Sequence, residues 1–156
     1  MNYEAVRYHD ISCGHRVAGH ENKCRHLHGH NYRVHFHCAA HRTQSSLDML
    51  GRVIDFGVIK ERLCMWIENH WDHKTLIWDK DVEFLDAVCI DKGPRASWVP
   101  LFAESIVLVP FNPTAENMAA YLLALSDSLL ADTGVEVRKV VIEETRKCSA
   151  AVERSV

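Results

Sequence analysis

Long apolar stretches are missing from this sequence of 156 residues. No apolar run approaches the roughly 20 residues that a helix needs to span a bilayer. The first residues carry charge at Glu4 and Arg7, where a secretory signal would need an apolar stretch. We therefore expect a soluble cytoplasmic protein with no membrane partner.

Glycine, proline and closely spaced cysteines are also scarce. Seven Gly and four Pro exclude fibrous and low-complexity proteins, and the 47% apolar content excludes a disordered chain. The six cysteines form no Cys-x-x-Cys pair, which excludes a zinc ribbon, and a disulfide framework is not expected in a chain this long. The net charge is −3 and the Lys and Arg residues are dispersed, so the charge pattern does not indicate a nucleic-acid-binding protein.

Histidine is the residue that the sequence has in excess. Nine of its eleven histidines lie between His9 and His41. The length suits one domain over residues 1–156, which can bury about 70% of the surface that the unfolded chain exposes. The sequence thus predicts a single globular domain with its polar chemistry concentrated in the first third.

Hydrophobic periodicity predicts the order strand, strand, helix, helix, strand, strand. Asp55 is placed to cap the first helix, and Asn112-Pro113-Thr114 opens the second. The segment Lys80–Val109 is the least regular, with Ile106–Val109 as a candidate extra strand. The predicted strands are 2–12, 31–40, 135–145 and 148–153, and residues 14–27 are predicted to form a polar connection.

The densest group of potential metal ligands is Cys24-Arg25-His26-Leu27-His28-Gly29-His30. On an extended chain His28 and His30 point to the same side, so both imidazoles can reach one ion. Gly29 removes a side chain where the backbone must approach other groups closely. His15 is the best candidate for a third ligand, and three neutral imidazoles leave zinc an open position, as in catalytic sites. A polar surface loop would give the same triplet, so this pattern alone leaves both interpretations open.

Other residue types suited to acid–base chemistry accompany this group. Cys24 is close enough in sequence to reach the same site, where a nearby cation favours the thiolate, although most such thiols are inert. Asp72-His73 is either an acid–base pair or a solvated helix end. Glu144 shares strand parity with Ile142, so it is predicted to project from an apolar face toward a ligand's N–H groups, unless the strand end frays into solvent.

Together these segments resemble the family of 6-pyruvoyl-tetrahydropterin synthases and 6-carboxy-5,6,7,8-tetrahydropterin synthases. The resemblance covers nearly the whole chain, and its motifs occur in the order that the family has them. These motifs are Cys13-Gly14-His15-Arg16, the segment 24–32, Val53-Ile54-Asp55-Phe56, Asp72-His73, Asn112-Pro113-Thr114-Ala115-Glu116-Asn117 and Ile142-Glu143-Glu144-Thr145.

The resemblance implies a catalytic zinc site beside a pterin pocket. The implied ligands of Zn2+ are His15, His28 and His30. The implied catalytic residues are the thiol of Cys24 and the acid–base pair Asp72 and His73. The implied substrate-binding residues are Thr114 and Glu144, which decides for Glu144 over Glu143.

The resemblance also implies a fold, an assembly and a reaction. The fold is the α+β tunnelling fold, a four-stranded antiparallel sheet with two helices on one face. Three sheets close into a barrel and two trimers form a homohexamer, so Cys24 and Asp72-His73 of one site come from different chains. The three residues between Cys24 and His28 resemble the 6-carboxy enzymes of queuosine and 7-deazaguanine biosynthesis. Those lyases convert 7,8-dihydroneopterin triphosphate to 6-carboxytetrahydropterin, acetaldehyde and triphosphate.

Several alternatives stay open. The 6-pyruvoyl enzymes, which have a longer gap at that motif, are the runner-up, and a non-catalytic zinc-binding protein on the same fold is the rival of another class. Cys13 is either an extra soft ligand or a space-filling side chain, and iron, nickel or copper also suit three imidazoles. His20 and His26 crowd the motif and permit another ligand set. The basic residues near the motif that are candidates to bind triphosphate are Arg16, Lys23 and Arg25.

Overall fold

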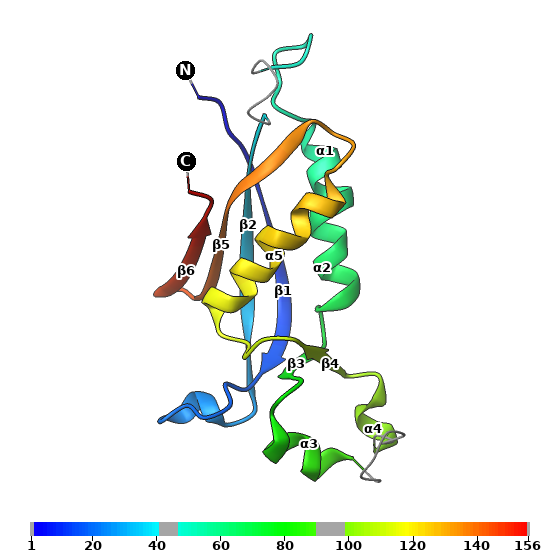
Figure 1. The fold of residues 1–156 in the computed structure, drawn as a ribbon, viewed down its shortest axis with the longest axis vertical. Helices are drawn as coiled ribbons and strands as arrows, with labels where there is room; N and C mark the ends of the chain where they lie inside the picture. The colour runs from blue at the N-terminus through cyan, green and yellow to red at the C-terminus, as the bar shows by residue number, and fades with distance from the viewer. Residues whose placement is uncertain (1, 41–46, 90–98, 156) are drawn as a thin grey trace.

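The chain forms one sheet of six strands in the order β4-β3-β1-β2-β5-β6, with helices on one side (Figure 1). The structure, a computed structural model, describes residues 2–40, 47–89 and 99–155. Prediction and structure agree on an α+β architecture. The strands are β1 (Ala5–His15), β2 (His28–Ala40), β3 (Thr75–Trp78), β4 (Ile106–Val109), β5 (Val135–Thr145) and β6 (Cys148–Glu153).

The long antiparallel pairing of β1 and β2 positions the histidine motif, which consists of His15, His28 and His30. Buried and exposed side chains alternate along β2 as predicted, with Tyr32, Val34 and Phe36 buried. The two strands continue pairing to His15↔His28, so the polar connection spans 16–27 rather than the predicted 14–27. Both parts of the motif therefore lie on regular strands, where strand parity fixes the direction of each side chain.

The prediction of a four-stranded, wholly antiparallel sheet is wrong. Strands β3 and β4 extend the sheet beyond β1 as parallel strands, through the pairs Gly14↔Thr75 and His15↔Leu76. The run Thr75–Trp78 has only four residues and follows the turn after α2 (Met65–His70), so it is too short to show a periodicity of its own. The candidate strand Ile106–Val109 is confirmed as β4, whereas residues 90–98 of the irregular segment lie outside the described residues.

Two helical segments cover one face of the sheet (Figure 1). The first is continuous from α1 (Phe56–Ile59) through a π turn, η2 (Lys60–Cys64), to α2 (Met65–His70), and the carboxylate of Asp55 accepts a hydrogen bond from Gly57 at its start. The second is α5 (Ala115–Leu129), which the hydroxyl of Thr114 caps. The predicted cap at Asp55 is confirmed, and the second helix begins after Asn112-Pro113-Thr114 as predicted, with Pro113 just before the cap instead of in the first turn.

The core lies between this face and the helices. Its largest fully buried side chains include Trp71, Tyr32, Phe36, Leu63 and Met118. Among the described residues, no helix is long and apolar enough to cross a membrane.

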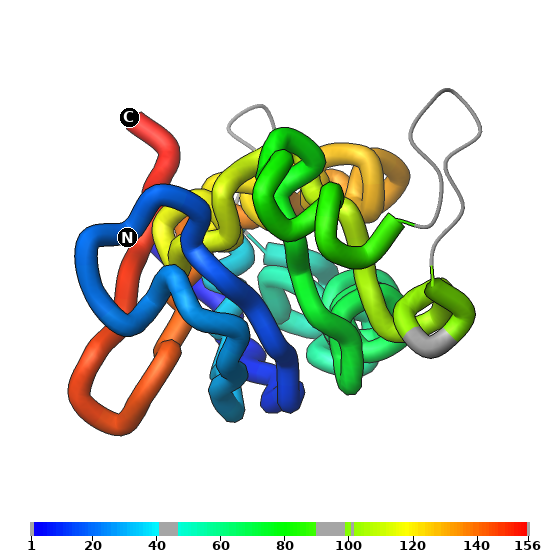
Figure 2. The backbone as a smooth tube through the Cα atoms, turned by 90° about the horizontal axis from the view of Figure 1, so that it is seen from below, coloured from blue at the N-terminus to red at the C-terminus, as the bar shows by residue number. Residues whose placement is uncertain are grey.

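The shorter helices gather at the end of the sheet where β1 terminates. Figure 2 views the molecule from that end, with the connection between β1 and β2 close to α3 (Val82–Val88). The remaining helices are the 3-10 turn η1 (Lys23–Arg25) and α4 (Pro100–Ala103). This end of the sheet carries the histidine motif.

Candidate metal centre and flanking pocket

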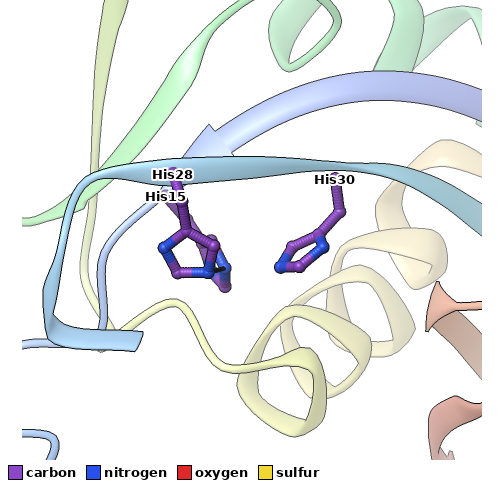
Figure 3. Close-up of side chains that lie close together, drawn as sticks. All are labelled: His15, His28 and His30. Carbon is purple, nitrogen blue, oxygen red and sulfur yellow. Dashed lines mark hydrogen bonds between the residues drawn. The ribbon is translucent and has the colours of Figure 1, made fainter. Parts of the chain in front are cut away.

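Three imidazoles from two strands converge at the end of the sheet. His28 and His30 project from the same side of β2 toward His15 on β1 (Figure 3). One ring nitrogen from each of the three lies within 4.8 Å of the other two, and the Nε2 atoms of His15 and His28 are 3.1 Å apart. Bonds of about 2.0–2.1 Å to a tetrahedral zinc ion set its nitrogen ligands about 3.3 Å apart. The cluster therefore has the spacing of a metal site.

Hydrogen bonds to backbone carbonyls orient two of these rings. The Nδ1 of His15 lies 2.7 Å from the carbonyl oxygen of Pro113, and the Nδ1 of His28 lies 2.7 Å from that of His26. A carbonyl only accepts, so we assign the proton of each neutral ring to Nδ1. Each Nε2 then presents a lone pair, and these lone pairs face each other. A cation between them satisfies both, so the donor set fits a divalent metal ion.

Burial keeps the rings of His15 and His30 in the form that binds metal. His15 is 1% exposed, and desolvation holds the pKa values of His15 and His30 below the ordinary value of 6.5. Desolvation disfavours the charged imidazolium, so the neutral ligand persists to lower pH than in an exposed histidine.

This pKa shift gives a testable pH dependence. Protons compete with a metal for imidazole nitrogens, and lowered pKa values move that competition to more acidic pH. Zinc affinity should therefore fall less steeply through pH 6.5 than it would for three independent imidazoles of ordinary pKa. Zinc titrations against a competing chelator at several pH values measure the slope. Three ordinary imidazoles are half protonated at pH 6.5 and would release about 1.5 protons per zinc, so a release that large would contradict the assignment.

Gly29 allows β1 and β2 to approach closely between the two motif histidines. A Cβ atom at this position would lie 2.9 Å from the carbonyl oxygen of Cys13 and 3.3 Å from the Cα of Gly14. These contacts are with backbone atoms that a rotamer change cannot move. The predicted reason for a glycine here is confirmed.

Glu144 reaches the cluster from β5. Its Oε1 lies 3.6 Å from the Nε2 of His15 and 3.7 Å from that of His30. The hydroxyl of Tyr32 donates a hydrogen bond of 3.4 Å to the same oxygen. Glu143 points to the opposite face and contacts His35 at 2.6 Å. The geometry thus agrees with the predicted parity of Glu144.

The sequence did not single out Tyr32 as a partner of Glu144. Its ring is fully buried, and desolvation, followed by the charge of Glu144, raises the pKa of its hydroxyl. Tyr32 therefore stays protonated and donates to the carboxylate. Strand parity placed Tyr32 on the histidine face, but it did not indicate that its hydroxyl reaches across to β5.

Cys24 and Thr114 line a pocket of about 200 Å3 together with His15 and Glu144. Cys24 lies in η1, which the hydrogen bond from the amide of Val17 to the carbonyl of Cys24 holds beside the end of β1. The hydroxyl of Thr114 accepts a hydrogen bond of 3.2 Å from the amide of Asn117. The predicted thiol, pterin anchor and threonine thus share one pocket with one of the predicted zinc ligands.

Asp72 and His73 lie elsewhere, at the edge of β1. Asp72 accepts a hydrogen bond of 2.8 Å from the amide of Ser12 and lies 2.6 Å from the Nδ1 of His73. Desolvation raises the pKa of Asp72, but these hydrogen bonds outweigh it, and the net pKa lies below the usual value. His73 has a left-handed φ of 56°, rare for a residue other than glycine, and its side chain is 81% exposed.

The pair of Asp72 and His73, called the dyad below, faces a different pocket from the one that Cys24 lines. Asp72 and His73 line a cavity of about 600 Å3 over the other face of the sheet, with Arg33 and Arg146. The described residues that line this cavity include none of those that line the pocket of Cys24. One copy of the chain therefore presents the thiol and the dyad on separate surfaces.

Arg16 is not a free cation beside the pocket. Its Nη2 donates a hydrogen bond of 2.7 Å to Glu83, and its Nε lies 2.6 Å from Oδ2 of Asp81 without hydrogen-bond geometry. Asp81 is 3% exposed and caps α3 through the amide of Phe84. Arg16, the residue after His15, is thus tied to the start of α3, which makes it a poor triphosphate ligand.

Removing the charge of Asp81 should destabilise the protein. An Asp81→Asn variant keeps the cap of α3 but leaves the half-buried Arg16 without its buried partner, which costs about 3 kcal/mol of unfolding free energy. Urea denaturation measures the change. Glu83→Gln is the matched control, because Glu83 is 83% exposed and its loss should cost only a small part of that. Equal stabilities of the two variants would contradict this account.

The other candidate ligands do not join the cluster. His20 lies on the rim of the pocket and accepts a hydrogen bond from the amide of Asn22, and His26 is exposed. Cys13 is 3% exposed, and burial raises its pKa to about 12, so it remains a thiol. The structure therefore favours the space-filling interpretation of Cys13.

Comparisons with known proteins agree with this geometry. The family model described as 6-pyruvoyl tetrahydropterin synthase matches residues 4–155. A 6-carboxy-5,6,7,8-tetrahydropterin synthase of Rickettsia typhi is 34% identical over 96% of this chain and 99% of its own length. An uncharacterized protein from Wolinella succinogenes has a similar crystal structure, with a TM-score of 0.80, 28% identity and 99% of each chain covered. The Plasmodium vivax 6-pyruvoyltetrahydropterin synthase shares the fold, with a TM-score of 0.69 at 19% identity over 100% of this chain and 99% of its own. The chain therefore belongs to the 6-pyruvoyl tetrahydropterin synthase family.

Proposed function

We propose that this chain is a zinc-dependent 6-carboxy-5,6,7,8-tetrahydropterin synthase, a lyase acting on 7,8-dihydroneopterin triphosphate. The observation that carries the proposal is the pocket that joins His15 of the metal cluster with Cys24 and Glu144. A metal store needs ligands, but it needs neither a thiol nor a carboxylate beside them. The name of the Rickettsia typhi relative supports the 6-carboxy product.

In this proposal His15, His28 and His30 hold the zinc ion, with Nδ1 of His15 and of His28 fixed by carbonyl oxygens. When bound, zinc supplies a Lewis acid that polarises oxygens of the substrate side chain. Of the three ligands, His15 also lines the pocket, so a zinc ion held by the cluster would lie beside it. The three histidines would hold the ion and perform no proton transfer themselves.

Cys24, Glu144 and Thr114 act on the substrate from the pocket. Glu144 accepts hydrogen bonds from N–H groups of the pterin ring, and the hydrogen bond from Tyr32 holds its carboxylate in place. Thr114 forms part of the wall at the start of α5. Cys24, as a thiolate, removes a proton from the side chain of the substrate.

Asp72 and His73 return protons, and they do so from a second copy of the chain. Asp72 holds Nδ1 of His73, which leaves Nε2 of that exposed ring to exchange a proton with the substrate. The separate pockets of Cys24 and of Asp72 with His73 support a site built from two copies. We propose a homohexamer built as a dimer of trimers, each copy a single domain over 1–156, without nucleic-acid or membrane partners, working in the cytoplasm in queuosine or 7-deazaguanine synthesis.

Product identification tests this function. Zinc-loaded protein is mixed with 7,8-dihydroneopterin triphosphate, and mass spectrometry identifies the products. We expect 6-carboxytetrahydropterin with equal amounts of acetaldehyde and triphosphate. Formation of 6-pyruvoyltetrahydropterin would replace the 6-carboxy assignment by the runner-up. Unchanged substrate, with zinc shown to be bound, would favour a non-catalytic zinc-binding protein.

A further inference from the structure

A second thiol faces the pocket of Cys24. Cys148, the first residue of β6, lines this pocket of about 200 Å3 together with Cys24 and Glu144. Cys148 is exposed and Cys24 is half-buried. Both cysteines therefore border the same pocket, although they lie 124 positions apart in the sequence.

Both residues are held near Glu144 by local structure. Cys148 pairs with Thr145 across the β5–β6 turn, and its amide donates a hydrogen bond of 3.1 Å to the hydroxyl of Thr145. From the other side, the carbonyl of Cys24 accepts a hydrogen bond of 2.8 Å from the amide of Val17. Local structure thus holds both cysteines in the wall of the pocket that Glu144 also lines.

The other four cysteines have different surroundings. Cys13, Cys38 and Cys64 are buried in the core, and burial raises the pKa of each. Cys89 follows α3 and is half-buried, and it is not among the residues that line this pocket. Among the six, Cys24 and Cys148 are the pair that shares a pocket open to solvent.

We propose that Cys24 and Cys148 are a redox pair, and that a peroxide oxidises them to an intramolecular disulfide that reversibly closes the pocket. The thiolate of Cys24 attacks one oxygen of hydrogen peroxide, the O–O bond breaks, and hydroxide leaves as Cys24 becomes a sulfenic acid. The thiol of Cys148 then attacks this sulfur, and the S–S bond forms with loss of water. Cysteine sulfur is oxidised by two electrons, and the peroxide is reduced to two waters.

The disulfide would block both pterin binding and the use of the Cys24 thiol in the pocket. A disulfide needs Cα atoms about 4.4–6.8 Å apart, so bond formation would hold the β5–β6 turn against η1. The space beside Glu144 is then filled, and the thiol of Cys24 is no longer available. The loss of activity, though not the disulfide itself, rests on the proposed function. Cys148 acts as the resolving thiol, which protects Cys24 from irreversible oxidation.

Mass spectrometry of the zinc-loaded full chain tests the proposal independently of turnover. After a small excess of hydrogen peroxide, we expect the chain to lose two hydrogen atoms and to yield a proteolytic peptide that links Cys24 to Cys148. Dithiothreitol should restore both thiols and the initial activity. In Cys148→Ala, the same treatment should carry Cys24 to a sulfinic acid that dithiothreitol does not reduce.

Cys89→Ala is the matched control, because it removes a half-buried thiol outside the pocket. It should form the Cys24–Cys148 link as the parent chain does. A link only between copies, or Cys24 oxidised to sulfinic acid while Cys148 remains a free thiol, would overturn the proposal. A disulfide formed in a protein that turns over no pterin would leave the redox pair standing and reject the proposed function alone.

Discussion

Replacing His28 with alanine should empty the metal centre. The imidazole of His28 supplies one of three ring nitrogens within 4.8 Å, and its Nδ1 is already fixed by the carbonyl of His26. Loss of an orienting partner alone costs about 10–100-fold in metal affinity, so loss of the ligand itself should cost more than about 10²-fold. Turnover of 7,8-dihydroneopterin triphosphate should fall to background. Isothermal titration with zinc and a product assay measure the two effects.

His26→Ala is the matched control for this variant. The side chain of His26 is exposed and outside the cluster, and only its backbone carbonyl, which alanine retains, contacts His28. Zinc affinity and turnover should therefore remain near those of the parent chain. If His26→Ala lost zinc and His28→Ala kept it, the ligand set proposed here would be refuted.

Cys24→Ala and His73→Ala should each lower kcat by about 10²–10⁴-fold, the usual contribution of one acid–base group. An equal mixture of the two variants, dissociated and reassembled, should recover about a quarter of the parent activity. Half of the copies supply an intact Cys24 and half an intact His73, so a quarter of randomly paired sites contain both. Steady-state kinetics before and after reassembly measure the recovery.

The recovery distinguishes two arrangements of the site. Without reassembly the mixed variants should stay inactive, which controls for contamination. A reassembled mixture with no more activity than either variant would show that Cys24 and His73 act within one copy. That outcome would contradict the inference drawn from their separate pockets.

The cluster of three histidines could be predicted from the sequence because alternate residues of a strand point to the same side of the sheet. His28 and His30 lie two residues apart on β2, and the register His15↔His28 brings the third ring beside them. The parity of Glu144 followed from the same rule. Local spacing therefore identified His28 and His30, the family resemblance supported His15 as the third member, and the pairing of β1 with β2 brings the three together.

Other features depend on contacts that local sequence patterns do not encode. Four residues, Thr75–Trp78, form β3 because β1 offers a free edge, and no pattern within the segment indicates that. The bond of Tyr32 to Glu144 and the buried pair of Arg16 with Asp81 join residues more than 60 positions apart. The separation of Cys24 from the dyad is likewise a property of the folded sheet, since the two lie on either side of it.

The contact between the Nδ1 of His15 and the carbonyl of Pro113 couples two processes that are usually considered apart. Pro113 immediately precedes Thr114, the N-cap of α5, so the hydrogen bond that orients the imidazole for a cation also anchors the start of this helix. By thermodynamic reciprocity, metal uptake must tighten the docking of α5 by the factor by which that docking raises the affinity for metal. Slower amide exchange along α5 on addition of zinc would be the signature of this linkage.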